Sequence, residues 1–135
     1  MSVHTAGPGP ALGGRRLTWT AVTAAVTAGV FLEAVFAGAL LSGAAWARTA
    51  HRADAIATIV VCVLAALAAL TLLRRVAQGL RLGFTLLGLA AVLVAQAALG
   101  AATTHGANLL WLHIPLGVAL VGLAMQAFTA ARRLG

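Results

Sequence analysis

Two histidines stand in matching sequence contexts, and imidazole is the commonest protein ligand for transition metals. His51 follows Gly38 by thirteen residues, and His113 follows Gly100 by the same interval. Each histidine lies near the start of a long apolar run, where an ionisable side chain is costly in lipid and marks a functional site by default. The repeated interval predicts a duplicated helical hairpin that offers two imidazoles to a common site.

The elements that position these histidines must be membrane helices, because the composition is that of a membrane protein. Hydrophobic residues make up 62% of the 135 residues, and the mean hydropathy is +1.04, whereas about half of a soluble domain is apolar. Cys62 is the single cysteine, which excludes a disulfide framework and the covalent attachment of a c-type haem. We expect Cys62 to be an inert core residue.

Four apolar runs are long enough for the roughly 20 residues that a helix needs to cross the hydrocarbon core. The predicted helices cover about 17–42, 49–73, 82–102 and 110–131; residues 1–16 are expected to form a disordered cytoplasmic tail and residues 17–133 the membrane domain. The predicted fold is all-α, a four-transmembrane-helix bundle made of two hairpins related by a pseudo-twofold axis along the membrane normal. Gly106 is predicted to end the third helix in a left-handed cap, and Asn108 to cap the fourth.

The arginines indicate how the bundle is oriented. All nine basic residues are arginines, and the net charge is +7. They stand at the ends of apolar runs rather than in a stripe, so they are a topology signal and not a nucleic-acid surface. Arg48 and Arg52 lie on one side, and the other seven lie on the opposite side: Arg15, Arg16, Arg74, Arg75, Arg81, Arg132 and Arg133. The positive-inside rule predicts a multi-pass protein of the plasma (inner) membrane with both termini in the cytoplasm.

Two imidazoles that face each other across a helix bundle suit the axial positions of a haem iron. Gly117, four residues after the second histidine on the same helical face, is expected to leave room for a porphyrin edge. Arg52 is expected to pair with a haem propionate, whereas Arg48 is interpreted as a snorkelling residue at a helix end. Asp54, in the first turn of the predicted second helix, either orients an imidazole or interacts with the helix dipole.

Glu33 and Gln96 occupy corresponding places in the two hairpins, before Gly38 and Gly100 respectively. This correspondence predicts hydrogen-bonding positions that line the cofactor space, with Glu33 a candidate for handling a proton coupled to electron transfer. The alternative is that Glu33 is a neutral carboxylic acid that links the first and third helices. His105, beside Gly106 in a turn, is expected to be exposed.

Three segments carry a family resemblance: AHRADA on the predicted second helix, AQAALGAATTHG across the third helix and its turn, and LHIPLGVAL on the fourth. In order and spacing, Phe31 to Arg132 resembles one four-helix half of the haem A synthase family. The resemblance implies that His51 and His113 are haem ligands. The chain departs from that family in having one half only, in having Arg48 where the catalytic half commonly has a glutamate, and in lacking an outer cysteine pair. These departures favour a stand-alone protein that binds haem b and serves electron transfer or haem handling, and they leave open whether it is an oxidoreductase.

Two other functions remain open at this point. A small multidrug-type, proton-coupled transporter would use Glu33 as its membrane carboxyl, although the third predicted helix offers only Phe84 to cradle a cation. A structural subunit of a respiratory complex would use its polar residues for helix packing. The lipid bilayer is the expected partner in each case, while a second copy of the chain, a respiratory-chain partner and a quinone are open, and a nucleic-acid partner is excluded.

Overall fold

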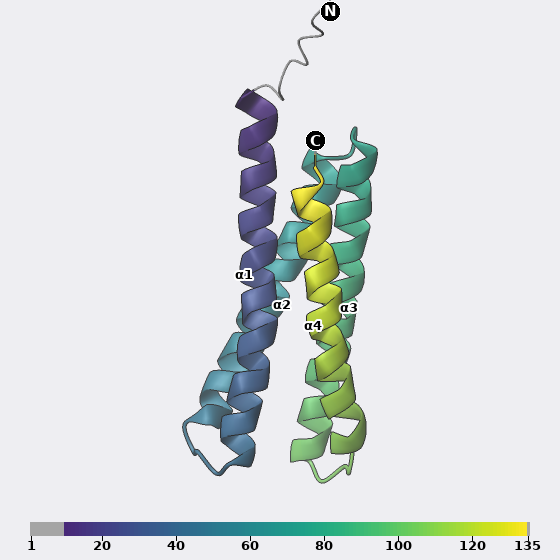
Figure 1. The fold of residues 1–135 in the computed structure, drawn as a ribbon. Coiled ribbons are helices and arrows are strands. Elements are labelled where there is room, and N and C mark those ends of the chain that lie inside the picture. Colours follow the sequence, from purple (N-terminus) through teal and green to yellow (C-terminus); the bar gives the residue numbers. More distant parts are fainter. Residues whose placement is uncertain (1–9, 135) are drawn as a thin grey trace, which may run out of the picture.

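The computed structural model describes residues 10–134, so residues 1–9 of the expected tail and Gly135 lie outside it. The described chain forms four α-helices: α1 (Pro10–Leu41), α2 (Ala47–Leu72), α3 (Ala77–Thr104) and α4 (Leu110–Arg132) (Figure 1). Each contains a stretch long and apolar enough to cross a membrane. The prediction of an all-α, four-span bundle is confirmed, and the chain is an integral membrane protein.

Two helices are longer than the sequence pattern predicts. Helix α1 begins at Pro10, so residues 10–16, which were expected to belong to the tail, are helical; proline is tolerated in a first turn, and the two arginines that follow are good helix formers. Helix α3 begins at Ala77 rather than at 82, because Gly79 does not interrupt it. Arg15, Arg16 and Arg81, which mark the ends of apolar runs, therefore lie inside the helices.

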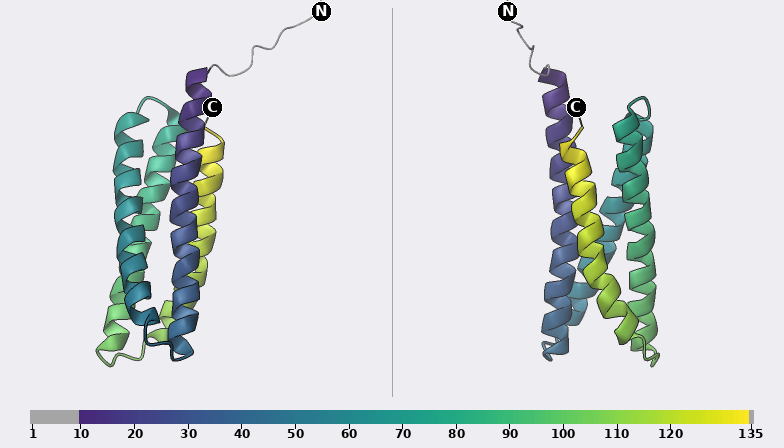
Figure 2. Two further views of the ribbon diagram at one scale, coloured as in Figure 1. Left: turned by 90° about the vertical axis from the view of Figure 1, so that its left-hand side faces the viewer. Right: turned by 45° about the vertical axis from the view of Figure 1, so that its right-hand side comes forward.

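Consecutive helices run antiparallel and form a four-sided bundle (Figure 2). Helix α1 packs against α2 and α4, and α3 packs against the same two helices, whereas the diagonal pairs α1/α3 and α2/α4 make no contact within the described chain. Both described ends and the α2–α3 connection lie together at what we call the termini end (Figure 1). Connections 42–46 and 105–109 form the opposite, loop end.

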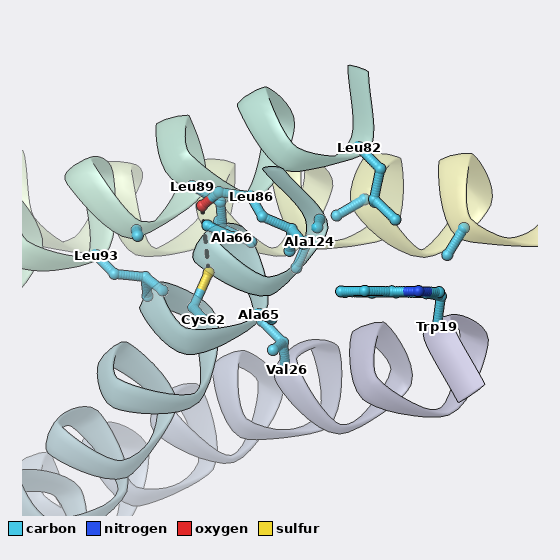
Figure 3. Packing of buried hydrophobic residues seen from close by; sticks show 14 of the residues in the cluster. Trp19, Val26, Cys62, Ala65, Ala66, Leu82, Leu86, Leu89, Leu93 and Ala124 are labelled. Carbon is cyan, nitrogen blue, oxygen red and sulfur yellow. Dashed lines mark hydrogen bonds between the residues drawn. The ribbon is translucent and has the colours of Figure 1, made fainter. Parts of the chain in front are cut away.

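The hydrophobic core occupies the half of the bundle next to the termini end. Its larger members include Trp19, Leu82, Leu86 and Leu89, which interlock with alanines of α2 and α4 (Figure 3). Small residues let the helix backbones approach closely, as at Gly29, where an added Cβ would collide with the Thr58 hydroxyl. The outward faces carry exposed large apolar side chains, as expected of helices solvated by lipid.

Two buried polar contacts cross between helices inside this packed half. The thiol of Cys62 donates to the carbonyl oxygen of Leu86 at 3.4 Å (Figure 3). The hydroxyl of Thr27 donates to the carbonyl oxygen of Ala124 at 3.3 Å. Bonds of this kind join helices in a medium where water offers no competing partner. They connect α2 to α3 and α1 to α4.

The half next to the loop end is packed differently. In the ranges 31–57 and 94–119, Ala47 is the one residue that is fully buried. Protein interiors are normally close-packed with apolar side chains. The bundle is therefore filled at one end, while its other end contains polar side chains of intermediate burial.

Both hairpin connections begin with the same helix-ending motif. Gly43 and Gly106 have φ angles of 88° and 92°, and the N–H of the residue after each glycine donates to a carbonyl five residues back, at 3.0 and 3.1 Å. This pattern is a Schellman motif and confirms the predicted cap at Gly106. The prediction for Asn108 is wrong: Leu109 occupies the N-cap of α4, and no side chain caps it.

Candidate functional site

Five polar side chains from all four helices gather near the loop end. Glu33 comes from α1, His51 and Asp54 from α2, Gln96 from α3 and His113 from α4, and all five are partly buried. Counted along the helices at 1.5 Å per residue, they lie roughly 5–12 Å from the loop end. This loop-end polar cluster is therefore near or just inside the boundary of the hydrocarbon layer, where unpaired polar groups are costly.

The closest contact in the cluster joins α1 to α2. Oε2 of Glu33 lies 2.6 Å from Nδ1 of His51, and the two side chains are 18% and 25% exposed. The two atoms are close enough for a hydrogen bond, but the N–H is not aligned with the oxygen in this structure, so we describe a close contact between a carboxylate and an imidazole. The suggestion that Glu33 links the first and third helices is wrong, because its carboxylate contacts His51 of α2, and α1 and α3 do not pack side by side. A carboxylate on Nδ1 leaves Nε2 as the nitrogen that can bind a metal.

Asp54 belongs to the same group of charges. It interacts electrostatically with both Glu33 and His51, and its Oδ2 is buried without a hydrogen-bond partner. Because α2 begins at Ala47, Asp54 lies in the second turn, and the first turn contains no acidic residue. The expected place of Asp54 in the first turn of the helix is therefore wrong, and its role beside the imidazole stays a prediction.

On the other side of the bundle, Gln96 serves the backbone rather than a side chain. Its Nε2 donates to the backbone oxygen of His113 at 2.8 Å. The same amide lies over Gly117, where an added Cβ would be 3.1 Å from it. The space at Gly117 that was expected to receive a porphyrin edge is taken by this amide, and Gln96 joins α3 to α4 as Glu33 joins α1 to α2.

The ring of His113 lies against Gly100 of α3. A Cβ at Gly100 would be 3.0 Å from Cε1 of the imidazole, so the ring occupies the place of the missing side chain. Nδ1 of His113 is buried and has no hydrogen-bond partner. The ring interacts electrostatically with His51 and with Glu33, so the two histidines share one polar region although their helices are diagonal and do not touch.

The cluster has several buried polar atoms without partners. These are Oε1 of Glu33, Nδ1 of His51, Oδ2 of Asp54, Oε1 of Gln96 and Nδ1 of His113, of which Nδ1 of His51 has the Glu33 carboxylate close by without an aligned hydrogen bond. A buried polar atom without a partner costs about 1–3 kcal/mol, and native structures contain few of them. A concentration of such atoms in one region is typical of a site that holds a further molecule.

The donor set narrows what that molecule can be. Within residues 10–134, no group of three or more His, Cys, Asp and Glu side chains is arranged to hold a bare metal ion. Two imidazoles on opposite helices suit a metal that brings its own equatorial ligands, as a haem iron does. The described side chains thus do not form the ligand set of a bare metal ion.

The remaining predicted residues lie at the rim. Arg48, Arg52 and His105 are all exposed at the loop end, and neither arginine forms an ion pair with another described residue. Arg52 is available to an anionic group at the membrane surface. The exposure of His105, which forms the C-cap of α3, is confirmed.

The sequence analysis missed the pairing of Glu33 with His51. One available signal was the register of the two hairpins. The ends of α1 and α3, at 41 and 104, are 63 residues apart, and so are the Schellman glycines at 43 and 106. Glu33 and Gln96 are separated by the same interval. The histidines at 51 and 113 repeat at 62. One residue is a rotation of about 100° on a helix, so the two imidazoles meet different neighbours.

Comparison of this chain with known protein families, with curated proteins and with solved structures found no match.

Proposed function

We propose that this membrane protein binds one b-type haem near the loop end of its bundle, with His51 and His113 as axial ligands, and that it serves electron transfer or haem handling. The observation that carries the proposal is the pair of inward imidazoles on diagonal helices, within a cluster of buried polar atoms that lack partners. The resemblance of three segments to half of a haem A synthase supports the same conclusion from the sequence.

Each residue of the cluster has a role in this proposal. Glu33 holds the imidazole of His51 through Nδ1, with Asp54 adding negative charge beside it. Gln96 anchors the backbone of α4 at His113. Arg52 is placed at the rim to pair with a propionate. When bound, a haem with two imidazole ligands supplies one-electron oxidation and reduction.

The position of the apolar core is consistent with this assignment. The core residues are confined to the termini end, so the polar side chains of the loop end are not part of an apolar core. In four-helix bundles, cofactors are held by side chains from facing helices, and His51 and His113 stand on such helices.

A visible spectrum tests the proposal. Protein purified in detergent from haem-replete cells should show a Soret band and, after reduction, sharp alpha and beta bands of a low-spin haem. Either His51→Ala or His113→Ala should abolish this low-spin signature, while His105→Ala, at an exposed position of the same end, should keep it. A colourless wild-type protein, or a low-spin spectrum that survives both ligand substitutions, would refute haem binding at this site and return Glu33 to the role of a transport carboxyl.

A further inference from the structure

We infer that the two axial histidines are unequal: Glu33 makes His51 the permanent ligand, and His113 is the exchangeable one, so that a neutral diatomic such as carbon monoxide enters on the α4 side. The inference rests on the proposed function and deepens it. It assigns Glu33 as a positioning residue and the His113 side of the site as a place where an external ligand binds.

The case for His51 is its carboxylate partner. Oε2 of Glu33 is 2.6 Å from Nδ1 of His51, and Asp54 interacts with the same imidazole. A carboxylate on the outer nitrogen of a ligating histidine holds the ring orientation and makes the inner nitrogen more basic, and loss of such partners commonly costs about 10- to 100-fold in metal affinity. His51 is therefore held by two neighbouring helices, because its own helix is α2 and its partner lies on α1.

The case for His113 is the lack of any such partner. Nδ1 is buried without a hydrogen bond in both histidines, but only that of His51 has a carboxylate beside it. Gln96 reaches only the backbone oxygen of His113. The ring lies against Gly100, which has no side chain to hold it. Nothing on α3 therefore holds the imidazole in one orientation.

The backbone around His113 is also less well stabilised. Pro115 lies inside α4, two residues further on, and a proline lacks the N–H that would bond to the carbonyl four residues earlier. A ring that is tethered only through its backbone, two residues before a proline, can swing away at smaller cost than one held by a carboxylate of a neighbouring helix.

The exchange would involve no electron transfer. In a haem-loaded protein His51 would keep holding the iron, while Nε2 of His113 would leave as a neutral imidazole and its place on the ferrous iron would be taken by carbon monoxide.

The first test uses the haem-free protein, so it does not depend on haem binding. Nitrogen-15 NMR of histidine-labelled protein should show His51 protonated on Nδ1, as an imidazole facing a carboxylate must be. Glu33→Leu should shift His51 toward a mixture of tautomers, and Glu33→Gln, which can still accept from Nδ1, should restore much of the wild-type signal. Gln96→Leu, at the corresponding position of the other hairpin, is the matched control and should leave His51 unchanged. An unchanged His51 signal in Glu33→Leu would overturn the role of Glu33.

The second test uses the haem-loaded protein. His113→Ala should retain a five-coordinate haem that binds carbon monoxide at once on reduction, whereas His51→Ala should lose the haem on purification. Glu33→Leu should lower haem affinity by about tenfold or more, and His105→Ala, at an exposed position of the same end, should not. Equal haem loss in the two histidine variants, or retention in His51→Ala, would overturn the inequality while leaving haem binding intact. Absence of haem from the wild type would refute the proposed function itself.

Discussion

At the scale of single residues, the absence of a side chain at position 100 is what lets the ring of His113 lie against α3. A Cβ there would be 3.0 Å from Cε1 of the imidazole, a distance that forces the ring to move. Gly38, the corresponding glycine of the first hairpin, has no atom within 4 Å of an added Cβ. The two glycines share a sequence context and differ in what they contact.

This difference makes a prediction. Gly100→Leu should displace the His113 ring and remove the low-spin haem signature, because a leucine fills the volume that the imidazole occupies. Gly38→Leu should keep that signature, since its side chain extends into open space. Reduced-minus-oxidised spectra of the two variants, normalised to protein, measure the effect. Loss of the signature in both, or in neither, would contradict the position given to the ring.

The residue scale also separates what the sequence predicts from what it does not. The cap at Gly106 was predictable because a left-handed backbone position near a helix end favours glycine, whatever the tertiary context. The partner of His51 was not, because it depends on how α1 and α2 are rotated against each other. The expectation that Gly117 leaves space for a porphyrin edge did not foresee the Gln96 amide, which lies there. That contact depends in the same way on how two neighbouring helices, α3 and α4, are rotated against each other.

At the scale of the helices, stability depends on close approach between small residues. The tightest example is Gly29 of α1 against Thr58 of α2, both buried. In a bilayer, van der Waals packing of this kind contributes much of the association between helices, because lipid tails are as apolar as the helix surfaces. The α1–α2 hairpin carries the Glu33–His51 contact, so its spacing matters for the site as well.

Gly29→Ala should destabilise the bundle by about 1–3 kcal/mol, the usual range for an extra carbon in a packed interior. The added Cβ meets the Thr58 hydroxyl and pushes α1 away from α2. Gly88→Ala is the matched control, because Gly88 is an exposed helical glycine with open space around it. Thermal unfolding in detergent, followed by helical circular dichroism, should show a lower midpoint for Gly29→Ala only. A midpoint equal to that of the wild type would mean that the helices do not meet at this position.

The number, order and type of the helices were predictable, because long apolar runs separated by short polar segments admit few alternatives in a membrane. Their ends were less so: α1 extends back to Pro10 and α3 to Ala77, since hydropathy marks the lipid boundary and not the end of hydrogen bonding. The one-residue difference between the repeat of the histidines and the repeat of the helix ends became visible only with the helix ends in place. That difference gives His51 and His113 their different neighbours.

At the scale of the whole molecule, the bundle divides into an apolar, packed half and a polar half with few buried residues. The packed half contains the core cluster and supplies the rigidity. The other half contains the ionisable residues of the membrane interior. Such residues lower the stability of the fold unless they are paired or bind a ligand. Such a division is expected where stability and function are assigned to opposite ends of the same four helices.

The distribution of charge predicts how these two halves are oriented in the membrane. Seven arginines lie at the termini end and two at the loop end, and an excess of arginine next to membrane spans is retained in the cytoplasm. We expect the loop end, with the proposed haem site, to face outward across the plasma membrane.

Cys62 is fully buried, so single cysteines introduced at the surface can report topology without background from the native thiol. Ser42→Cys and Asn108→Cys should react with a membrane-impermeant maleimide on intact cells. Gly13→Cys should react only after the membrane is opened, because seven arginines outweigh two in setting the topology. Labelling of Gly13→Cys on intact cells would invert the proposed orientation and would mean that another signal sets the topology.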